Sequence, residues 1–179
     1  DRLAKDFDIT WDSVMTELED GATIGRPALA DALVRAGVVA DRTEAFAGIL
    51  SKHGGYYVPN VVVETADAIQ LVLAAGGVPV IAHPLTGIGR NTDRGDLPLE
   101  HFEALIAGGL AGFEVYHREV PEIARGWLLD LAKKYDLVVT GSSDYHGVNG
   151  KPNRLGENYT DPEMLQRIIA LSSGTKPQL

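Results

Sequence analysis

The stretch VVTGSSDYHG, residues 138–147, joins a short apolar run to two side chains that can bind a metal ion. Residues 137–140 are apolar or favour β-structure, and the glycine and serines after them predict a turn. Residues two apart in an extended chain point the same way, so Asp144 and His146 can reach one point in space. From this spacing alone, a metal site and ordinary turn chemistry are about equally favoured.

A second apolar run repeats this design. Residues 78–82 read VPVIA and predict a strand that ends at His83 and Pro84. A lone histidine at such a place is more often structural, hydrogen-bonded to a loop carbonyl. In α/β folds, however, ligands gather at the carboxyl ends of strands, so we expect both runs to line one crevice. Imidazole nitrogen and carboxylate oxygen together suit Mn²⁺, Fe²⁺ or Zn²⁺ better than Ca²⁺ or Mg²⁺.

The rest of the chain alternates helices and strands. A third strand is predicted at residues 112–116, and helices are predicted to follow Thr65, Pro98, Pro121 and Asp161. Strand, helix and strand in succession favour an α/β fold with a parallel sheet. Residues 1–55 instead predict a small helical subdomain, with helices at 11–18, 27–36 and 43–51, in front of a domain at 56–179.

The composition is that of an ordinary soluble protein. The 179 residues are 45% hydrophobic and 23% charged, and the formal net charge is −9. This charge argues against a protein that coats duplex DNA, whereas a metal site can still bind a small phosphorylated substrate. The absence of cysteine excludes disulfides and thiolate metal sites. No membrane-spanning run and no signal-peptide pattern is visible, so the expected location is cytoplasmic.

The segments GGVPVIAHP, GFEVYH and LVVTGSSDYHG resemble, in order and spacing, the carboxy-terminal part of the PHP family, the polymerase and histidinol phosphatase superfamily of metal-dependent phosphoesterases. The segments ATIGRPALADALVRAG and GYYVP resemble the helical insert of its nucleotide-phosphatase and exoribonuclease-like branch. The resemblance implies an α/β fold, the later part of a distorted (β/α)7 PHP barrel with a small helical insert at the start. It also implies that His83, Asp144 and His146 ligate divalent metal ions (Mn, Fe or Zn), two or three in the intact protein.

The function implied by the resemblance is metal-dependent hydrolysis of phosphate esters by a metal-activated water, on nucleotides or short oligoribonucleotide ends. One alternative is a small-metabolite phosphatase of the histidinol phosphatase type. Another is a non-catalytic PHP-like interaction module, although the helical insert favours a stand-alone enzyme. Neither a Gly-x-Ser-x-Gly elbow nor a Walker phosphate loop is present to support other chemistry.

The amino-terminal metal-ligand segments of the family, which include a His-x-His strand, are absent from this sequence. We therefore expect the chain to be the later portion of a longer protein. By itself it is expected to hold metal weakly and to show little or no turnover. A barrel without some of its strands exposes a sheet edge and apolar surface, which favours self-association.

The candidate substrate-binding residues are Arg26, His117 and Arg154. Arg26 resembles a phosphate-facing arginine of the insert, but a solvated arginine at a helix start is equally favoured. The related branch usually has histidine where this chain has Ala28, which weakens the assignment of Arg26. Four cations in predicted loops can together form a collar that binds an anion: Arg90, Arg94, Lys151 and Arg154. Each of them alone has the pattern of a solvated surface charge.

His117 lies just beyond the strand predicted at residues 112–116. Alternation along this strand predicts that Glu114 and Tyr116 point to one face and Val115 and His117 to the other. The sequence leaves two roles open for His117, a contact with the substrate or a structural place in the pocket wall.

Overall fold

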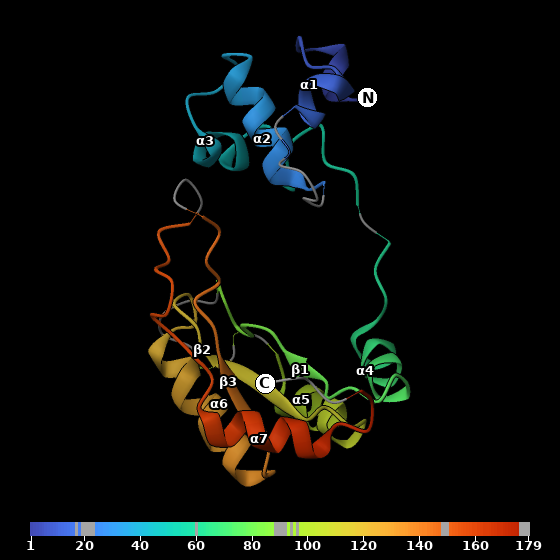
Figure 1. Ribbon diagram of the computed structural model, residues 1–179, viewed down its shortest axis with the longest axis vertical. Coiled ribbons are helices and arrows are strands. Elements are labelled where there is room, and N and C mark those ends of the chain that lie inside the picture. Colours follow the sequence, from blue (N-terminus) through green and yellow to red (C-terminus); the bar gives the residue numbers. More distant parts are fainter. Residues whose placement is uncertain are drawn as a thin grey trace. The chain divides into compact units, whose positions relative to one another are not determined.

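The chain folds into two compact units, Asp1–Val61 and Val62–Leu179. The computed structural model describes residues 1–16, 18, 24–59, 61–87, 93, 95, 97–147 and 151–175. Figure 1 shows that the first unit is helical and that the second contains a sheet with helices around it. Each unit has its own hydrophobic core.

The described residues of the first unit form four short helices: η1 (Leu3–Lys5), α1 (Trp11–Met15), α2 (Arg26–Arg35) and α3 (Arg42–Ala47). Helices α1, α2 and α3 match the three predicted helices, but α1 ends before residue 18 and α3 before residue 51. These helices and the turns beside them share one buried core, which includes Leu3, Ile9, Val14, Ala28, Ala30, Ala32, Leu33, Ala45 and Leu50.

Side-chain caps fix where these helices begin. Thr10 starts α1 with a capping box, in which the Thr10 and Ser13 side chains each accept the other residue's backbone N–H. Asp41 starts α3 by accepting the backbone N–H of Glu44 at 2.8 Å.

Tyr56 and Tyr57 contact residues of the helical unit, which extends to Val61, whereas the sequence analysis places the boundary after residue 55. The hydroxyl of Tyr56 donates to Asp6 at 3.0 Å, and its ring lies 5.4 Å from that of Phe7. Arg2 donates to the carbonyl oxygen of Tyr57 at 2.9 Å. These contacts tie the segment after Gly55 back to the first residues of the chain.

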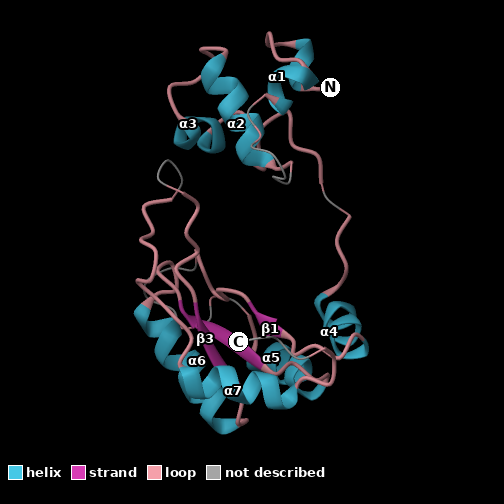
Figure 2. Ribbon diagram, in the orientation of Figure 1, coloured by secondary structure: helices cyan, strands magenta, loops and turns pink. Residues whose placement is uncertain are grey.

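The second unit follows the predicted order of helices and strands (Figure 2). Its elements are α4 (Thr65–Ala74), β1 (Val80–Ile81), α5 (Leu99–Ala107), β2 (Gly112–Tyr116), α6 (Glu122–Lys134), β3 (Val138–Gly141) and α7 (Pro162–Leu171). The strands form a parallel sheet in the order β1-β2-β3. The prediction of a mixed α/β fold with a parallel sheet is therefore confirmed.

Helices pack against the sheet because the apolar side chains of its strands are buried beneath them. Helix α6 packs on β2 and β3, α7 packs on β3, and α4 contacts α5. The core of this unit lies between helices and sheet, and it includes Ile69, Leu85, Phe102, Leu105, Leu110, Phe113, Val115, Val120, Ala124, Leu128, Leu131, Ala132 and Leu137. The parallel arrangement places the carboxyl ends of the three strands at one edge of the sheet.

The pairing of β2 with β3 is irregular near these carboxyl ends. Glu114 pairs with Thr140, whereas the next paired residue, Tyr116, pairs with Gly141. One residue of β2, Val115, is therefore extra in the ladder, as in a β-bulge. Bulges re-aim side chains, and this one lies beside the candidate site.

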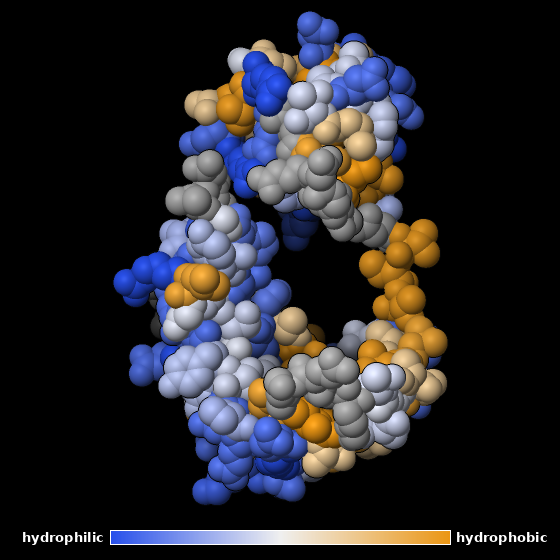
Figure 3. Space-filling view, in the orientation of Figure 1, coloured by the Kyte–Doolittle hydropathy of each residue, from blue (hydrophilic) through white to orange (hydrophobic). Residues whose placement is uncertain are grey.

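Apolar surface is exposed on the segment that joins the two units, where Figure 3 shows a run of hydrophobic residues. Val61, Val62 and Val63 are 105%, 75% and 57% exposed. Such surface is compatible with self-association, which stays a prediction. Across the part of the chain that the structure describes, no helix has the length and apolar character needed to cross a membrane.

Candidate functional site

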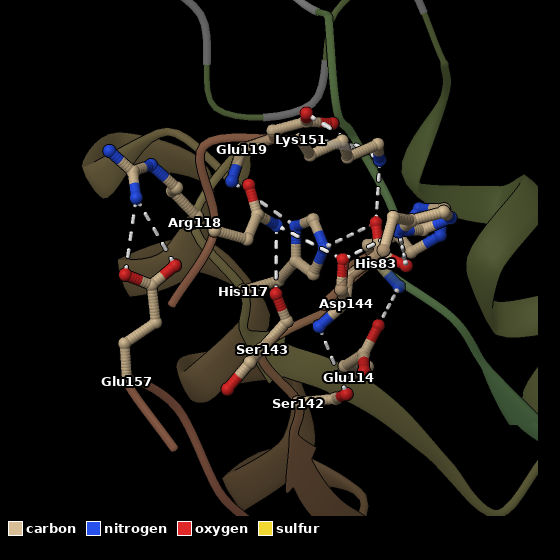
Figure 4. Close-up of polar contacts among 12 residues, drawn as sticks. His83, Glu114, His117, Arg118, Glu119, Ser142, Ser143, Asp144, Lys151 and Glu157 are labelled. Atoms are coloured by element: carbon tan, nitrogen blue, oxygen red, sulfur yellow. Dashed lines mark hydrogen bonds and ion pairs between the residues drawn. The ribbon is translucent and has the colours of Figure 1, made fainter. Parts of the chain in front are cut away.

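The carboxyl ends of the three strands bring polar residues from distant parts of the sequence together (Figure 4). His83 follows β1, Glu114 and His117 come from the end of β2, and Asp144 follows β3. The rings of His83 and His117 lie 4.8 Å apart between their centroids, and Nε2 of His117 lies 3.5 Å from Oδ2 of Asp144. His117 thus links the two predicted metal-binding stretches.

Asp144 is surrounded by nitrogen atoms. The ammonium of Lys151 donates to its Oδ2 at 2.5 Å, and Nδ1 of His146 lies 3.6 Å from its Oδ1. Burial acts to raise the pKa of the Asp144 carboxyl, but Lys151, followed by His146 and His117, outweighs burial and holds this pKa below its ordinary value. The lowered pKa favours the anionic form of Asp144, which attracts cations.

The hydrogen bonding of His146 leaves one of its ring nitrogens available to a metal ion. Its Nδ1 lies 2.7 Å from the backbone carbonyl oxygen of Asp144. A carbonyl can only accept, so we assign the proton to Nδ1 and the lone pair to Nε2. Metal-ligating histidines commonly have this arrangement. The side chain is 47% exposed, so an ion can reach it.

Two of the predicted ligands have left-handed backbone conformations, with φ of 29° at His83 and 47° at Asp144. Such conformations cost non-glycine residues about 1–3 kcal/mol and persist where neighbours hold them. The Glu114 carboxylate accepts the backbone N–H of His83 at 2.7 Å, and the Ser142 hydroxyl accepts that of Asp144 at 3.3 Å. Backbone strain at both predicted ligands is typical of a functional site.

A buried amide supports the turn that carries Asp144. Asn153 is 4% exposed, and its Nδ2 donates to the carbonyl oxygen of Ser143 at 2.8 Å. The Ser143 hydroxyl donates to the carbonyl oxygen of Asn158 at 3.3 Å. Neither Asn153 nor the contact of Glu114 with His83 was predicted, since the only sequence signals were a polar loop and a strand end.

The predicted ligands suit a metal ion in kind but supply too few donors. Among the described residues, no three His, Cys, Asp or Glu side chains are grouped so that they could hold one ion. A neutral imidazole and a carboxylate are ligands of Mn²⁺, Fe²⁺ and Zn²⁺. Protein zinc sites have three or four protein ligands, so His83, Asp144 and His146 could form a site only with further ligands. Their role as ligands stays a prediction.

One of the remaining predicted residues lies at this cluster, and the others belong to the helical unit, to an exposed loop or to segments outside the described residues. In the helical unit, Arg26 donates to the carbonyl oxygen of Leu50, and its guanidinium lies 5.1 Å from the ring centre of Phe46. Arg154 is 84% exposed along its side chain, with Nε 3.5 Å from Glu157. Of the proposed anion collar, Lys151 lies at Asp144, whereas Arg90 and Arg94 are outside the described residues.

Comparisons with known proteins support a phosphoesterase. The chain is 34% identical over 108 residues to a phosphoribosyl 1,2-cyclic phosphate 1,2-diphosphodiesterase of Eggerthella lenta, covering 60% of this chain and 38% of the relative. It is 46% identical to a solved structure from Bifidobacterium adolescentis described as a candidate metal-dependent phosphoesterase, with a TM-score of 0.84 over 98% of this chain and 60% of that one. The chain thus spans less than two thirds of either relative.

A third protein shares the fold alone. It is an amidohydrolase from Chromobacterium violaceum, solved with bound sulfate and no metal, with 24% identity and a TM-score of 0.64 over 94% of this chain and 58% of that one. No family model matches the chain. The two more similar proteins confirm the predicted resemblance.

Proposed function

We propose that the chain belongs to the PHP-type metal-dependent phosphoesterases and that the protein hydrolyses a phosphate ester of a small substrate by metal-activated water. The observation that supports this most directly is the pair formed by His146 and Asp144. Nε2 of His146 keeps an accessible lone pair beside an anionic carboxylate, at the strand ends where ligands bind in α/β folds.

His83, Asp144 and His146 are the proposed ligands, completed by groups beyond this cluster. A divalent ion bound there would lower the pKa of a coordinated water and stabilise charge on the phosphoryl oxygens. Lys151 has a different role, which is to bind the substrate. Its ammonium lies 2.5 Å from Asp144 and 3.7 Å from Glu119, and the hydrogen bond to Asp144 raises the pKa of Lys151. It therefore remains a cation that can bind a phosphoryl oxygen at the same place.

The favoured substrate class is a small molecule with a phosphodiester. The name of the Eggerthella lenta relative refers to a cyclic phosphate of a sugar phosphate. The net charge of −9 disfavours a long nucleic acid, which would bring many negative charges. Nucleotides and the ends of short oligoribonucleotides remain candidate substrates, and Arg26 and Arg154 remain candidate contacts for them.

The sheet is proposed to be part of a distorted (β/α)7 barrel. Its strands are all parallel and are connected through helices, as a barrel of this type requires. The similarity in fold to proteins longer than this chain supports the same proposal.

The test is made on the full-length protein. Its metal content is measured by elemental analysis, and hydrolysis is assayed with Mn²⁺ on a ribose 1,2-cyclic phosphate, nucleoside 3′- and 5′-phosphates, a short oligoribonucleotide and histidinol phosphate. Asp144→Ala and His146→Ala are expected to lose both metal and turnover. His53→Ala is the matched control, because His53 is an exposed histidine of the helical unit.

The substrate panel separates the alternatives. Turnover of the cyclic phosphate that depends on Asp144 supports the proposal, and turnover of histidinol phosphate alone points to a small-metabolite phosphatase. A protein without metal or turnover, even with added Mn²⁺, would overturn the proposal and favour a non-catalytic interaction module.

A further inference from the structure

His117 differs from the other histidines of the site in burial and in hydrogen bonding. Its side chain is fully buried, with 0% exposure. Its Nδ1 accepts the backbone N–H of Glu119 at 3.1 Å. An amide N–H can only donate, so Nδ1 must hold the lone pair and the ring proton belongs on Nε2. This is the opposite of His146, whose Nδ1 donates to a carbonyl oxygen.

Within the described part of the chain, the buried Nε2–H of His117 makes no hydrogen bond. Oδ2 of Asp144 lies 3.5 Å away, just beyond the usual distance for an N–H donor. A buried donor without an acceptor is unfavourable, so a small approach of the carboxylate would be stabilising.

We propose that His117 is a positioning residue for Asp144, donating its Nε2–H to Oδ2 and so leaving Oδ1 available to the divalent ion that the site would hold. This inference rests on the metal site proposed above. Carboxylates that ligate metals are themselves hydrogen-bonded, and these partners orient them. Oδ2 can accept from both His117 and Lys151, because a carboxylate oxygen has two lone pairs.

Two other roles for His117 fit less well. A metal ligand needs a free lone pair on a ring nitrogen. In His117, Nδ1 uses its lone pair to accept the N–H of Glu119, and Nε2 carries the proton. A substrate contact, predicted from the sequence, needs an accessible nitrogen, but Nε2 is enclosed. The carbonyl oxygen of His117 is also held, by Arg125 at 3.4 Å, which fixes the backbone that carries the ring.

The first test examines the tautomer in the full-length, metal-free protein by ¹⁵N NMR of its histidines. We expect Nδ1 of His117 to be unprotonated and Nε2 protonated, with a downfield Nε2–H signal that moves upfield in Asp144→Ala. A protonated Nδ1, or an Nε2–H signal unchanged by Asp144→Ala, would overturn the proposal. This readout needs neither metal nor activity, so it stands apart from the proposed function.

The second test compares two substitutions by Mn²⁺ titration of the full-length protein. His117→Leu fills similar space without a donor and is expected to weaken Mn²⁺ binding about 10- to 100-fold. His117→Gln places an amide donor where Nε2 stands and is expected to restore affinity to within a few-fold. His101→Gln, on the exposed face of α5, is the control and should bind as the wild type does.

The two substitutions also separate positioning from ligation. Equal loss of Mn²⁺ in the Leu and Gln variants would mean that His117 acts through its lone pair, and the proposal would fail. Thermal unfolding verifies that each variant folds. If the Leu variant does not fold, the Gln variant and the NMR signal still decide.

Discussion

Oε2 of Glu114 accepts the backbone N–H of His83 at 2.7 Å, so a side chain of β2 holds the residue that follows β1. The bond is partly buried, and a hydrogen bond away from water is electrostatically stronger than one in water. It constrains the peptide at which His83 adopts a φ of 29°. The orientation of a predicted metal ligand therefore depends on a residue that need not touch the ion.

We expect Glu114→Ala to weaken Mn²⁺ binding by about 10-fold or more, the usual loss when a residue that orients a ligand is removed. Glu114→Gln should bind nearly as the wild type does, because its amide oxygen still accepts the N–H of His83. Isothermal titration of the full-length protein measures both. If the Gln variant lost as much affinity as the Ala variant, the charge of Glu114 would matter, and the residue would have to be counted among the ligands.

Asn153→Ala is expected to destabilise the turn that carries Asp144. The carbonyl oxygen of Ser143 is buried and would lose the donor that lies 2.8 Å away. An unsatisfied buried acceptor costs about 1–3 kcal/mol, which urea unfolding can measure. Asn153→Asp should cost at least as much, since it keeps the shape and places a negative oxygen against the carbonyl. An unchanged midpoint in both variants would contradict this account of the turn.

The positions of helices and strands in the second unit follow from patterns that sequence displays directly. The strand predicted at residues 112–116 is Gly112–Tyr116 in the structure, and a proline precedes or begins three of its helices. Hydrophobic periodicity and helix-start residues are local properties, and they are read without knowledge of tertiary contacts.

The site was only partly predictable, because its details depend on contacts between distant residues. The alternation predicted along β2 is seen in the burial of its side chains, because Val115 and His117 are buried and Glu114 and Tyr116 are not. It did not reveal that Glu114 and His117 would both reach the site, on either side of a shift in register. Nor can a sequence assign the proton of His117, which depends on the backbone N–H of Glu119.

An acid-sensitive contact joins α5 to the end of α6. The hydroxyl of Tyr135, followed by the ammonium of Lys134, donates to Glu103 and holds the pKa of this carboxyl below its ordinary value of 4.5. A carboxyl with a lower pKa in the folded state stabilises the fold above its unfolded pKa, and this contribution is lost as the pH falls through the folded pKa.

Glu103→Gln should therefore lower the thermal midpoint at about pH 7, and the difference from the wild type should shrink at about pH 3. Melting curves at both values measure the effect. Glu100→Gln, on the same helix, corrects for the loss of one negative charge. A difference between wild type and Glu103→Gln that grew at acid pH would have the wrong sign for this contact.

Close packing of β2 against β3 leaves no room for a side chain at Gly112. An added Cβ there would lie 2.3 Å from the carbonyl oxygen of Val138 and 2.4 Å from its Cγ2. Gly112→Ala is expected to lower the free energy of unfolding by about 1–3 kcal/mol or more, because backbone atoms would have to move.

Gly126→Ala is the matched control in α6, where a Cβ would meet nothing within 4 Å, and it should gain about 0.5–1 kcal/mol from helix propensity. Urea unfolding of both variants gives the comparison. If Gly112→Ala were as stable as the wild type, the pairing of Gly112 with Val138 would be wrong. This register of β2 and β3 aligns the strand ends that carry His117 and Asp144.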